Sequence, residues 1–371
     1  MSRTPSPHHS NTPILQYSNT PILQYSTTPI LQFSLSPMIE LRDDSLHFSF
    51  PDLHPDAHCT ISFQRTLRIP DDDKTWPLPP GLGRFPIVHV DDFAANLPPD
   101  WYEHGGVAFP MYQSEAMWLS FSRTDYPFAI KVAAGKIDAI TGETWSAELT
   151  AEPQNYLVLP TQPWLDGFVV RKGVIRQFVA MPLGSGYSAE EQITGAAEHG
   201  GLQIQVYPMR PEIYRKTIEV RERASMRRQF RAPGIACAPT PDMGLAPGGQ
   251  MRQEIYHDRY GFNVWDRSHT SRCFIHLCNS VIWQSITGRR PPYPPPTAKS
   301  YSDAGLPWFD YYRDDTPALA GGKILAGLKS IFQMSDSKCD HTLAENDAPK
   351  LHPGQIRNLG KPRRLVREMN E

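Results

Sequence analysis

The residues best suited to metal chemistry are His269, Cys273, His276 and Cys278. Imidazole nitrogens and thiolates are the ligands that zinc prefers in proteins. On a helix, the first three would share one face and Cys278 would point away; on a strand, His276 and Cys278 would share a face without Cys273. Neither geometry gathers four ligands, and the spacing matches no zinc-finger signature. We therefore expect both thiols to be core residues, with a metal site as the alternative, and we predict no cofactor.

A glycine loop, Gly184-Ser185-Gly186, follows an expected strand and precedes an expected helix. Ser188 with Glu191 three residues later forms a capping-box pattern, which predicts a helix from Ala189. A helix N-terminus after such a loop can bind an anion through free backbone N–H groups. No lysine follows the loop as in a Walker A motif, and no third glycine stands at the Rossmann spacing. An ordinary loop is favoured, and a phosphate-binding loop is the alternative.

Polar side chains recur at alternate positions in two expected strands, residues 58–69 and 202–208. They would line a hydrophilic cleft or a barrel mouth if both strands contributed to it. An ordinary solvent-facing surface is the favoured reading, because antiparallel sheets commonly have one polar face. With the two polar residues of the strand 174–181 and the glycine loop, the candidate ligand-binding residues are Gln64, Arg68, Arg176, Gln177, Gly184, Gly186, Gln203, Gln205 and Tyr207.

Acid-base groups are scattered through the chain, for example Glu115, Asp166, Glu191, His199 and His276. No spacing among them assembles a catalytic triad, a carboxylate pair or a metal cage. Catalytic residues can be far apart in a sequence, so an enzyme remains an alternative without a named reaction.

About eight strand candidates lie between residues 58 and 208, separated by turn signals and with little helical periodicity. This pattern predicts an α+β, β-rich fold: a mostly antiparallel sandwich or barrel-like sheet with a few C-terminal helices. Residues 174–181 are apolar on both faces and predict a central strand, joined to 168–171 by a hairpin through Lys172 and Gly173. Residues 115–121 and 128–133 are expected to form another hairpin.

Two charged features of this region need partners or solvent. Arg65 interrupts the apolar face of the strand 58–69. It must reach the strand edge or be held inside by a carboxylate that the sequence does not identify. The acidic run that begins at Asp71 is expected to be a solvated turn.

The C-terminal part predicts a helix over 272–287, capped by Ser268 or Thr270 and stopped at Gly288. A hairpin is expected within 254–266 and a glycine-weakened helix over 318–334. The run RRPPYPPPT, residues 289–297, predicts polyproline II geometry. It is either a stiff connector, which we favour, or a ligand for an aromatic groove.

These elements suggest five regions. Residues 1–37 hold an octad repeat (SNTPILQY, twice, then STTPILQF), which is expected to be disordered or untranslated, with translation starting at Met38. Residues 38–231 would form the β-rich core domain and 232–250, rich in proline and glycine, a linker or loop. Residues 251–335 would be an aromatic-rich helical and β segment packed on the core, and 336–371 a polar tail.

Composition limits the function classes. The 371-residue chain has a net charge of −2, so no global field recruits nucleic acid or a membrane, and no run of 18 apolar residues predicts a transmembrane helix. The stretch 211–231 holds seven basic and three acidic residues, but no DNA-binding pattern supports it. Five cysteines are an odd count and predict no disulfide framework. The first 37 residues have one positive charge, Arg3, and no continuous apolar core, so they are a poor secretory signal and a cytoplasmic location is expected.

We therefore expect a soluble β-rich binding or interaction protein. Its partner would be a small polar ligand in the sheet cleft, or another protein docking on the aromatic C-terminal segment. The alternative is an enzyme acting on a small polar or phosphorylated substrate near the loop Gly184–Gly186.

Overall fold

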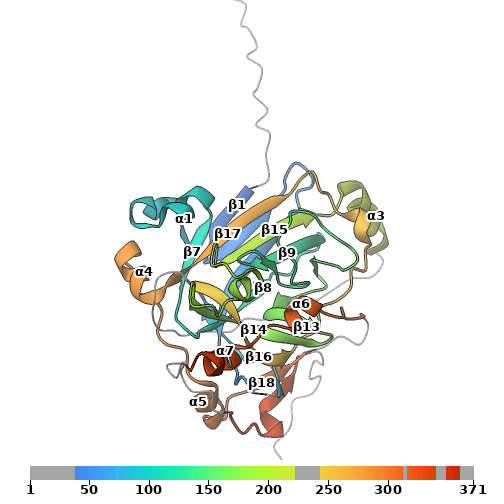
Figure 1. The fold of residues 1–371 in the computed structure, drawn as a ribbon. Helices are drawn as coiled ribbons and strands as arrows, with labels where there is room; N and C mark the ends of the chain where they lie inside the picture. The colour runs from blue at the N-terminus through green and yellow to red at the C-terminus, as the bar shows by residue number, and fades with distance from the viewer. Residues whose placement is uncertain (1–37, 73, 222–242, 312–315, 340–347, 360–371) are drawn as a thin grey trace, which may run out of the picture. The chain divides into compact units, whose positions relative to one another are not determined.

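Two large β-sheets form the framework of the computed structural model, which describes residues 38–72, 74–221, 243–311, 316–339 and 348–359 (Figure 1). All of them belong to one compact unit, which spans Leu35–Glu371. Strand pairing is mostly antiparallel; only β4 with β16, β7 with β17 and β18 with β19 run parallel among the described strands. The predicted α+β, β-rich class is confirmed as a mixed-sheet structure, and the described strands close no barrel.

The ten-stranded sheet has the order β1 (Met38–Arg42), β2 (Ser45–Ser49), β3 (His58–Thr66), β8 (Ala116–Phe121), β14 (Val174–Pro182), β16 (Met243–Arg252) and β4 (Thr75–Trp76). Three further strands pair outside this order: β5 (Gly81–Arg84) with β3, β12 (Trp164–Leu165) with β8 and β13 (Gly167–Arg171) with β14. The seven-stranded sheet has the order β10 (Ile137–Asp138), β9 (Phe128–Ala134), β15 (Leu202–Pro208), β17 (Ser271–Asn279), β7 (Val107–Met111) and β6 (Val88–His89), with β11 (Leu157–Leu159) on β9. A small third sheet pairs β18 (Trp308–Asp310) with β19 (Ile356–Asn358).

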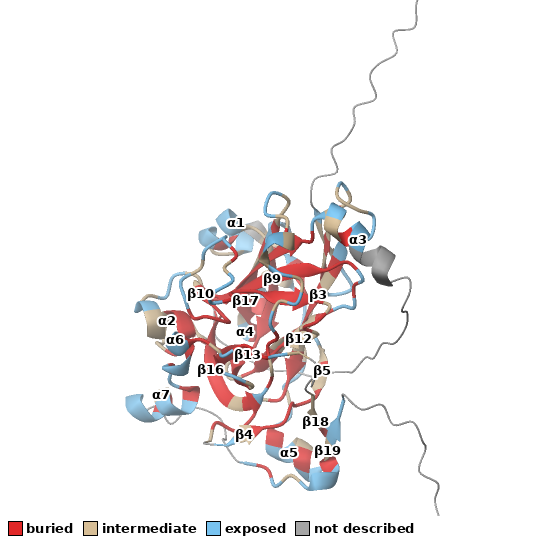
Figure 2. Ribbon diagram, turned by 90° about the vertical axis from the view of Figure 1, so that its right-hand side faces the viewer, coloured by how far each residue is buried: buried red, intermediate tan, exposed pale blue. Residues whose placement is uncertain are grey.

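Short helices connect these strands. They are α1 (Pro99–His104), α2 (Ala189–Thr194), α3 (Pro211–Arg221), α4 (Ser280–Thr287), α5 (Ala298–Asp303), α6 (Lys323–Ala326) and α7 (Ile331–Lys338), with 3-10 turns η1 (Asp91–Asn96), η2 (Phe262–Val264) and η3 (Pro353–Gln355). Figure 2 shows the strands of both sheets mostly buried, while exposed residues gather on helices and loops.

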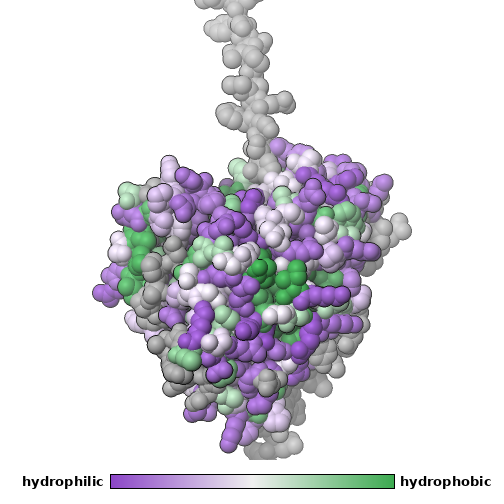
Figure 3. All heavy atoms as spheres, in the orientation of Figure 1, coloured by the Kyte–Doolittle hydropathy of each residue, from purple (hydrophilic) through white to green (hydrophobic). Residues whose placement is uncertain are grey.

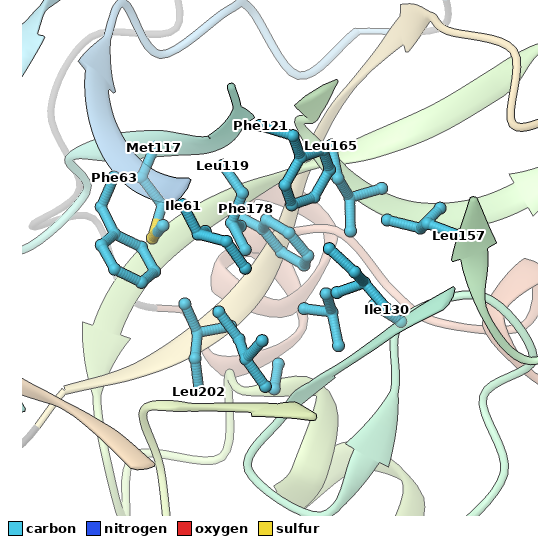
Figure 4. Packing of buried hydrophobic residues seen from close by; sticks show 14 of the residues in the cluster. Ile61, Phe63, Met117, Leu119, Phe121, Ile130, Leu157, Leu165, Phe178 and Leu202 are labelled. Carbon is cyan, nitrogen blue, oxygen red and sulfur yellow. The ribbon is translucent and has the colours of Figure 1, made fainter. Parts of the chain in front are cut away.

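The main core lies between the inner faces of the two large sheets. Figure 4 shows Ile61, Phe63, Leu119 and Phe178 of the ten-stranded sheet close to Leu202 of the seven-stranded one. Because apolar side chains alternate along these strands, each sheet contributes one continuous apolar surface to this layer. Burying this surface is the main stabilising contribution to the fold.

Strand β14 is the predicted central strand, and its first eight residues are all buried. It pairs with β13 through the predicted turn, where Gly173 has a φ of 72°. It also pairs with β8 and β16. Local chemistry therefore identified both this strand and its hairpin correctly.

The predicted linker is wrong over its described part, because Met243–Arg252 forms β16 and pairs along the whole of β14. Its glycines serve close packing: a Cβ atom on Gly249 would lie 2.3 Å from the carbonyl oxygen of Pro70. The β14/β16 register shifts between Arg176 and Phe178, and Pro247 stands opposite Phe178, beside this irregularity. Residues 232–242 lie outside the described residues. Strands β16 and β17 place the C-terminal segment inside both sheets.

The helix predicted over 272–287 is also wrong in its first half. Ser271–Asn279 forms β17, and the helix α4 is capped by Asn279 rather than by Ser268 or Thr270, although it ends at Gly288 as predicted. Both faces of β17 carry apolar residues because both are partly covered. Its alternation was therefore hidden in the sequence.

Three other expected elements differ from the structure. Strands β8 and β9 lie in different sheets, so residues 115–133 form no hairpin. In the region 254–266, η2 replaces the predicted hairpin, and the Asp258 carboxylate accepts backbone hydrogen bonds from Tyr260 and Gly261. The helix predicted over 318–334 is broken into α6 and α7, because Ser330 starts a new capping box with Gln333.

The region expected to be a polar tail, residues 336–371, is partly folded onto the protein. Residues 348–359 include β19, and the Gln355 amide donates to the carbonyl oxygen of Ser302 at 2.9 Å. Residues 340–347 and 360–371, like the octad repeat at 1–37, lie outside the described residues.

Candidate functional site

The predicted ligand-binding residues lie in two different sheets and do not line one cleft. Arg176 and Gln177 belong to β14, and Gln64 to β3, of the ten-stranded sheet, where Gln64 donates to the Ser62 hydroxyl at 3.0 Å. Gln203, Gln205 and Tyr207 lie on the outer face of the seven-stranded sheet; all three are buried.

The Gln177 side chain links β14 to a neighbouring segment of the chain. Its side chain is 0% exposed; its amide nitrogen donates to the Leu67 carbonyl at 2.8 Å, and its amide oxygen accepts from the Ile69 N–H at 3.0 Å. The side chain thereby pairs β14 with the backbone that follows β3. Such hydrogen bonds satisfy polar groups that water cannot reach.

We expect Gln177→Met to lower the free energy of unfolding by about 2 kcal/mol, because two buried backbone groups would lose their partners. Urea unfolding measures this change. Gln64→Met is the matched control, since Gln64 is half-buried and, among the described residues, its side chain hydrogen-bonds only the Ser62 hydroxyl; it should cost less than about 0.5 kcal/mol. Equal costs for the two variants would contradict the structural role of Gln177.

Asp71 is a buried junction rather than the expected solvated turn. Its Oδ1 lies 3.6 Å from Nη1 of Arg176, and its Oδ2 accepts from the Phe332 N–H at the start of α7. Burial lowers the pKa of Arg68, and the negative charge of Asp71 raises it again. Arg176 also donates to the Gly248 carbonyl at 3.1 Å. Both arginines therefore belong to a charged cluster inside the framework.

The backbone N–H groups of the glycine loop already bind a carboxylate of the chain itself, that of Glu191. Glu191 completes the predicted capping box: its carboxylate accepts from the N–H groups of Gly186 at 2.6 Å and Ser188 at 3.1 Å. The Lys338 ammonium contacts the carbonyl of Ser185. The donors that would hold a phosphate are thus already used by Glu191, while Gly184 supplies a turn with φ 85°.

The four metal candidates do not converge. On β17, Cys273 packs into the main core, whereas Cys278 faces the opposite side. His276 stacks on Trp101 with ring centroids 4.6 Å apart, and His269 Nδ1 lies 3.0 Å from Asp266 Oδ2. Across the described ranges, no group of three or more His, Cys, Asp or Glu residues is placed to hold a metal ion.

Arg65 is held inside by Glu115, the carboxylate that the sequence left unidentified. Both side chains are 1% exposed and form an ion pair through Nη2 and Oε1. The Glu115 Oε2 atom accepts from the Tyr112 N–H at 3.0 Å. Burial raises the pKa of Glu115 to about 7, although the charge of Arg65 and the Tyr112 hydrogen bond lower it.

Asp166 is a second buried carboxylate, at 4% exposure. Its Oδ2 accepts from the Gln253 amide at 2.5 Å, and burial raises its pKa to about 8. Glu115, Asp166 and Glu191 therefore occupy three separate positions in the framework. Among the proposed acid-base groups, only His199 and His276 share a neighbourhood, around His104.

The outer face of the seven-stranded sheet brings cations and aromatic rings together. Strand register places Lys131, Gln205 and Arg272 in one row across three strands, and Gln203 beside Phe274 in the next. Sequence reasoning found the glutamines but missed Arg272 and Phe274, because it took their segment for a helix. As a strand, Arg272, Phe274 and His276 alternate on one side.

The loop that carries Trp145 covers one end of this face, and an apolar cluster covers the other, so the accessible part lies between them. At one end, the Lys131 ammonium donates to the carbonyls of Ser146 and Glu148, both at 2.8 Å, and the Tyr207 hydroxyl donates to that of Ala147. These bonds fasten the loop that carries Trp145 over the sheet. Burial raises the pKa of Tyr207, which keeps its hydroxyl a donor.

At the other end, an apolar cluster of α1, α4 and η1 covers the face. Trp101 and Trp283 pack there on Ala108 and Cys278. In Figure 3, apolar side chains gather over α1 and α4, at the left edge of the view; Val281 is among the exposed ones.

Arg272 is the centre of the accessible part. Its guanidinium carbon lies 4.6 Å from the ring centroid of Phe274 and 5.3 Å from that of Trp145, and an Nη2 hydrogen bond reaches Gln203 Oε1. Gln203 is itself fixed by donating to the Gly135 carbonyl at 2.7 Å. The residue Arg272 is nevertheless exposed, so it offers further N–H donors to solvent.

Histidines form the rim next to Phe274. The His104 ring lies 4.9 Å from Phe274 and 5.3 Å from His199. Burial lowers the pKa of His199, while the nearby Glu190 carboxylate raises it. Burial also lowers the pKa of His276 to about 4, so this imidazole is neutral at pH 7.

Several buried polar atoms have no hydrogen-bond partner among the described residues, and three of them belong to residues next to the accessible part of this face: Trp145 Nε1, Gln205 Oε1 and Glu190 Oε1. Buried polar atoms are nearly always hydrogen-bonded, and exceptions call for a bound water or ligand. We call Trp145, Gln203, Gln205, Arg272 and Phe274 the outer-face site, with His104, His199 and Glu190 at its rim.

Comparisons with known proteins add no relative. No family model matches the chain, no curated protein matches it, and no solved structure matches it. None of the described helices is long and apolar enough to cross a membrane.

Proposed function

We propose that this protein binds a small polar ligand that carries a carboxylate or phosphate group, and that the ligand lies on the outer-face site. The observation that carries the proposal is that Arg272 is an exposed residue whose guanidinium is nevertheless fixed by its neighbours. Two aromatic rings and Gln203 hold it in place, and its remaining N–H groups match the oxygens of an anion.

Preorganisation makes this arginine a better anion site than an ordinary surface arginine. A free arginine loses rotamer freedom when it binds, which offsets part of the interaction energy. Arg272 has already been ordered by folding, through Trp145, Phe274 and Gln203. A ligand therefore gains the charge-assisted hydrogen bonds at a smaller entropic cost.

The neighbouring groups favour a ligand with further polar groups. In the part of the chain that the structure describes, Gln205 Oε1 and Glu190 Oε1 are buried acceptors without a partner, and Trp145 Nε1 is a donor without one. These atoms have almost no accessible surface, so hydroxyl or amino groups of a ligand would satisfy them only where side chains of the site move aside. The faces of Trp145 and Phe274 suit the C–H surface of a small ring. A hydroxy acid, a sugar acid or a sugar phosphate has this combination of groups.

Arg272→Ala is expected to weaken anion binding at least tenfold, because the loss of a charge-assisted bidentate contact costs about 1.5–3 kcal/mol. Isothermal titration with inorganic phosphate and with a panel of hydroxy acids, sugar acids and sugar phosphates measures this. Arg171→Ala is the matched control: it removes the same charge from an exposed residue of the other sheet. Arg272→Lys should also bind weakly, since an ammonium cannot make the planar contact.

Two results would contradict this proposal. One is that no compound of the panel binds the wild-type chain; the other is that Arg272→Ala and Arg171→Ala bind with the same affinity. Binding lost in Arg272→Ala but kept in Arg171→Ala supports the outer-face site.

A further inference from the structure

The proline-rich run Arg289–Thr297 connects α4 to α5 and forms no helix or strand. The cis peptide bonds of the described residues precede Pro153 and Pro160, so the bonds before the prolines of this run are trans. Proline fixes its own φ near −65° and keeps the preceding residue out of the helical region. Consecutive trans prolines favour the polyproline II conformation.

Exposure along the run is uneven. Arg290, Tyr293, Pro294 and Pro296 are exposed, whereas Pro291, Pro292 and Pro295 are half-buried. The ring of Tyr293 is among the most exposed large side chains of the described residues, at 78%. One face of the segment thus lies on the protein, and another presents a tyrosine, a proline and an arginine to solvent.

Two buried side chains anchor the inner face through consecutive backbone carbonyls. Arg65 Nη1 donates to the Tyr293 carbonyl at 3.2 Å, and the Tyr112 hydroxyl donates to the Pro292 carbonyl at 3.3 Å. Arg65 is fixed in turn by its ion pair with Glu115. A simple spacer between two helices requires no such anchors, and it requires no aromatic ring in solvent.

We infer that Arg289–Thr297 is a docking surface for a protein domain with an aromatic-lined, acidic groove. Aromatic grooves bind polyproline II segments because these are already extended and lose little entropy on binding. The anchors from Arg65 and Tyr112 reduce that loss further. Arg289 and Arg290, both exposed at one end of the run, would pair with carboxylates of the groove and set the direction of docking. This surface is separate from the outer-face site.

Site-specific photo-crosslinking of the full chain in its own cells tests the inference. We expect p-benzoylphenylalanine in place of Tyr293 to form an adduct with one other protein, mapped by mass spectrometry to a groove lined by aromatic residues. The same photoprobe in place of Tyr102, which is 57% exposed on α1, should not form that adduct. In the chain with the probe at position 293, Pro294→Ala with Pro296→Ala should lower the yield at least fivefold.

A second measurement uses the captured protein in purified form. Arg290→Glu should weaken its binding to the full chain at least tenfold, while the urea midpoint of the variant stays unchanged, because Arg290 is exposed. The inference is overturned by the absence of a protein adduct specific to position 293. It is equally overturned by an adduct with a second copy of this chain or with RNA, or by adducts that survive both proline substitutions.

Discussion

Glu115→Ala is expected to lower the free energy of unfolding by about 3–5 kcal/mol, the usual cost of removing one partner from a buried ion pair. The variant leaves the Arg65 guanidinium, which is 1% exposed, without its carboxylate. It also leaves the buried Tyr112 N–H without an acceptor. Urea unfolding at pH 7 measures the loss.

Two variants separate the cost of an unpaired charge from the value of the pair. The double variant Arg65→Met with Glu115→Leu removes both charges of the pair and should recover most of the loss. Glu198→Ala breaks the pair with Lys136, which is partly exposed, and should cost less than about 1 kcal/mol. If Glu115→Ala costs no more than Glu198→Ala, the buried pair does not stabilise the core as described.

Asp166→Asn is expected to remove the part of a pH-dependent loss of stability that comes from the titration of Asp166. The pKa of Asp166 is raised from 3.8 to about 8, so the folded chain keeps a proton that the unfolded chain releases. This contribution is fully present below about pH 4 and is lost as the pH rises to about 8. At about 1.4 kcal/mol per pH unit, the wild type should lose about 3–4 kcal/mol between pH 5 and pH 8 through this group.

The measurement is a series of urea midpoints from pH 5 to pH 9. Asparagine keeps the acceptor for Gln253 but carries no titratable proton, so the variant should gain stability on the wild type as the pH rises. Glu115 contributes in the same direction, with a pKa raised to about 7, and it titrates in both chains. Asp56→Asn, at an exposed carboxylate, should leave the profile unchanged. Parallel profiles for the wild type and Asp166→Asn would contradict the assignment.

Local sequence chemistry predicted the elements whose signals do not depend on distant residues. The hairpin at Gly173 needed only a residue that tolerates positive φ, and the capping box of α2 needed only Ser188 and Glu191. Strand β15 was evident because its apolar and polar residues alternate. The α+β, β-rich class followed from many such short signals.

Tertiary structure decided everything that depends on what covers a strand. Strand β16 looked like a linker because its Pro247 and glycines signal loops, yet they fit a strand irregularity and a close approach of two backbones. Strand β17 looked like a helix because covering of both its faces erased the alternation. The sequence likewise could not assign Glu115 to Arg65, since the partners are 50 positions apart.

The outer-face site likewise depends on both local sequence and tertiary structure. The alternation of Gln203, Gln205 and Tyr207 determined that these side chains share one face. Only the folded chain places Trp145 and Arg272 over that face, because they come from a loop and a strand that are remote in the sequence. Side-chain type and local spacing are written in the sequence; which groups meet depends on the packing of the two sheets.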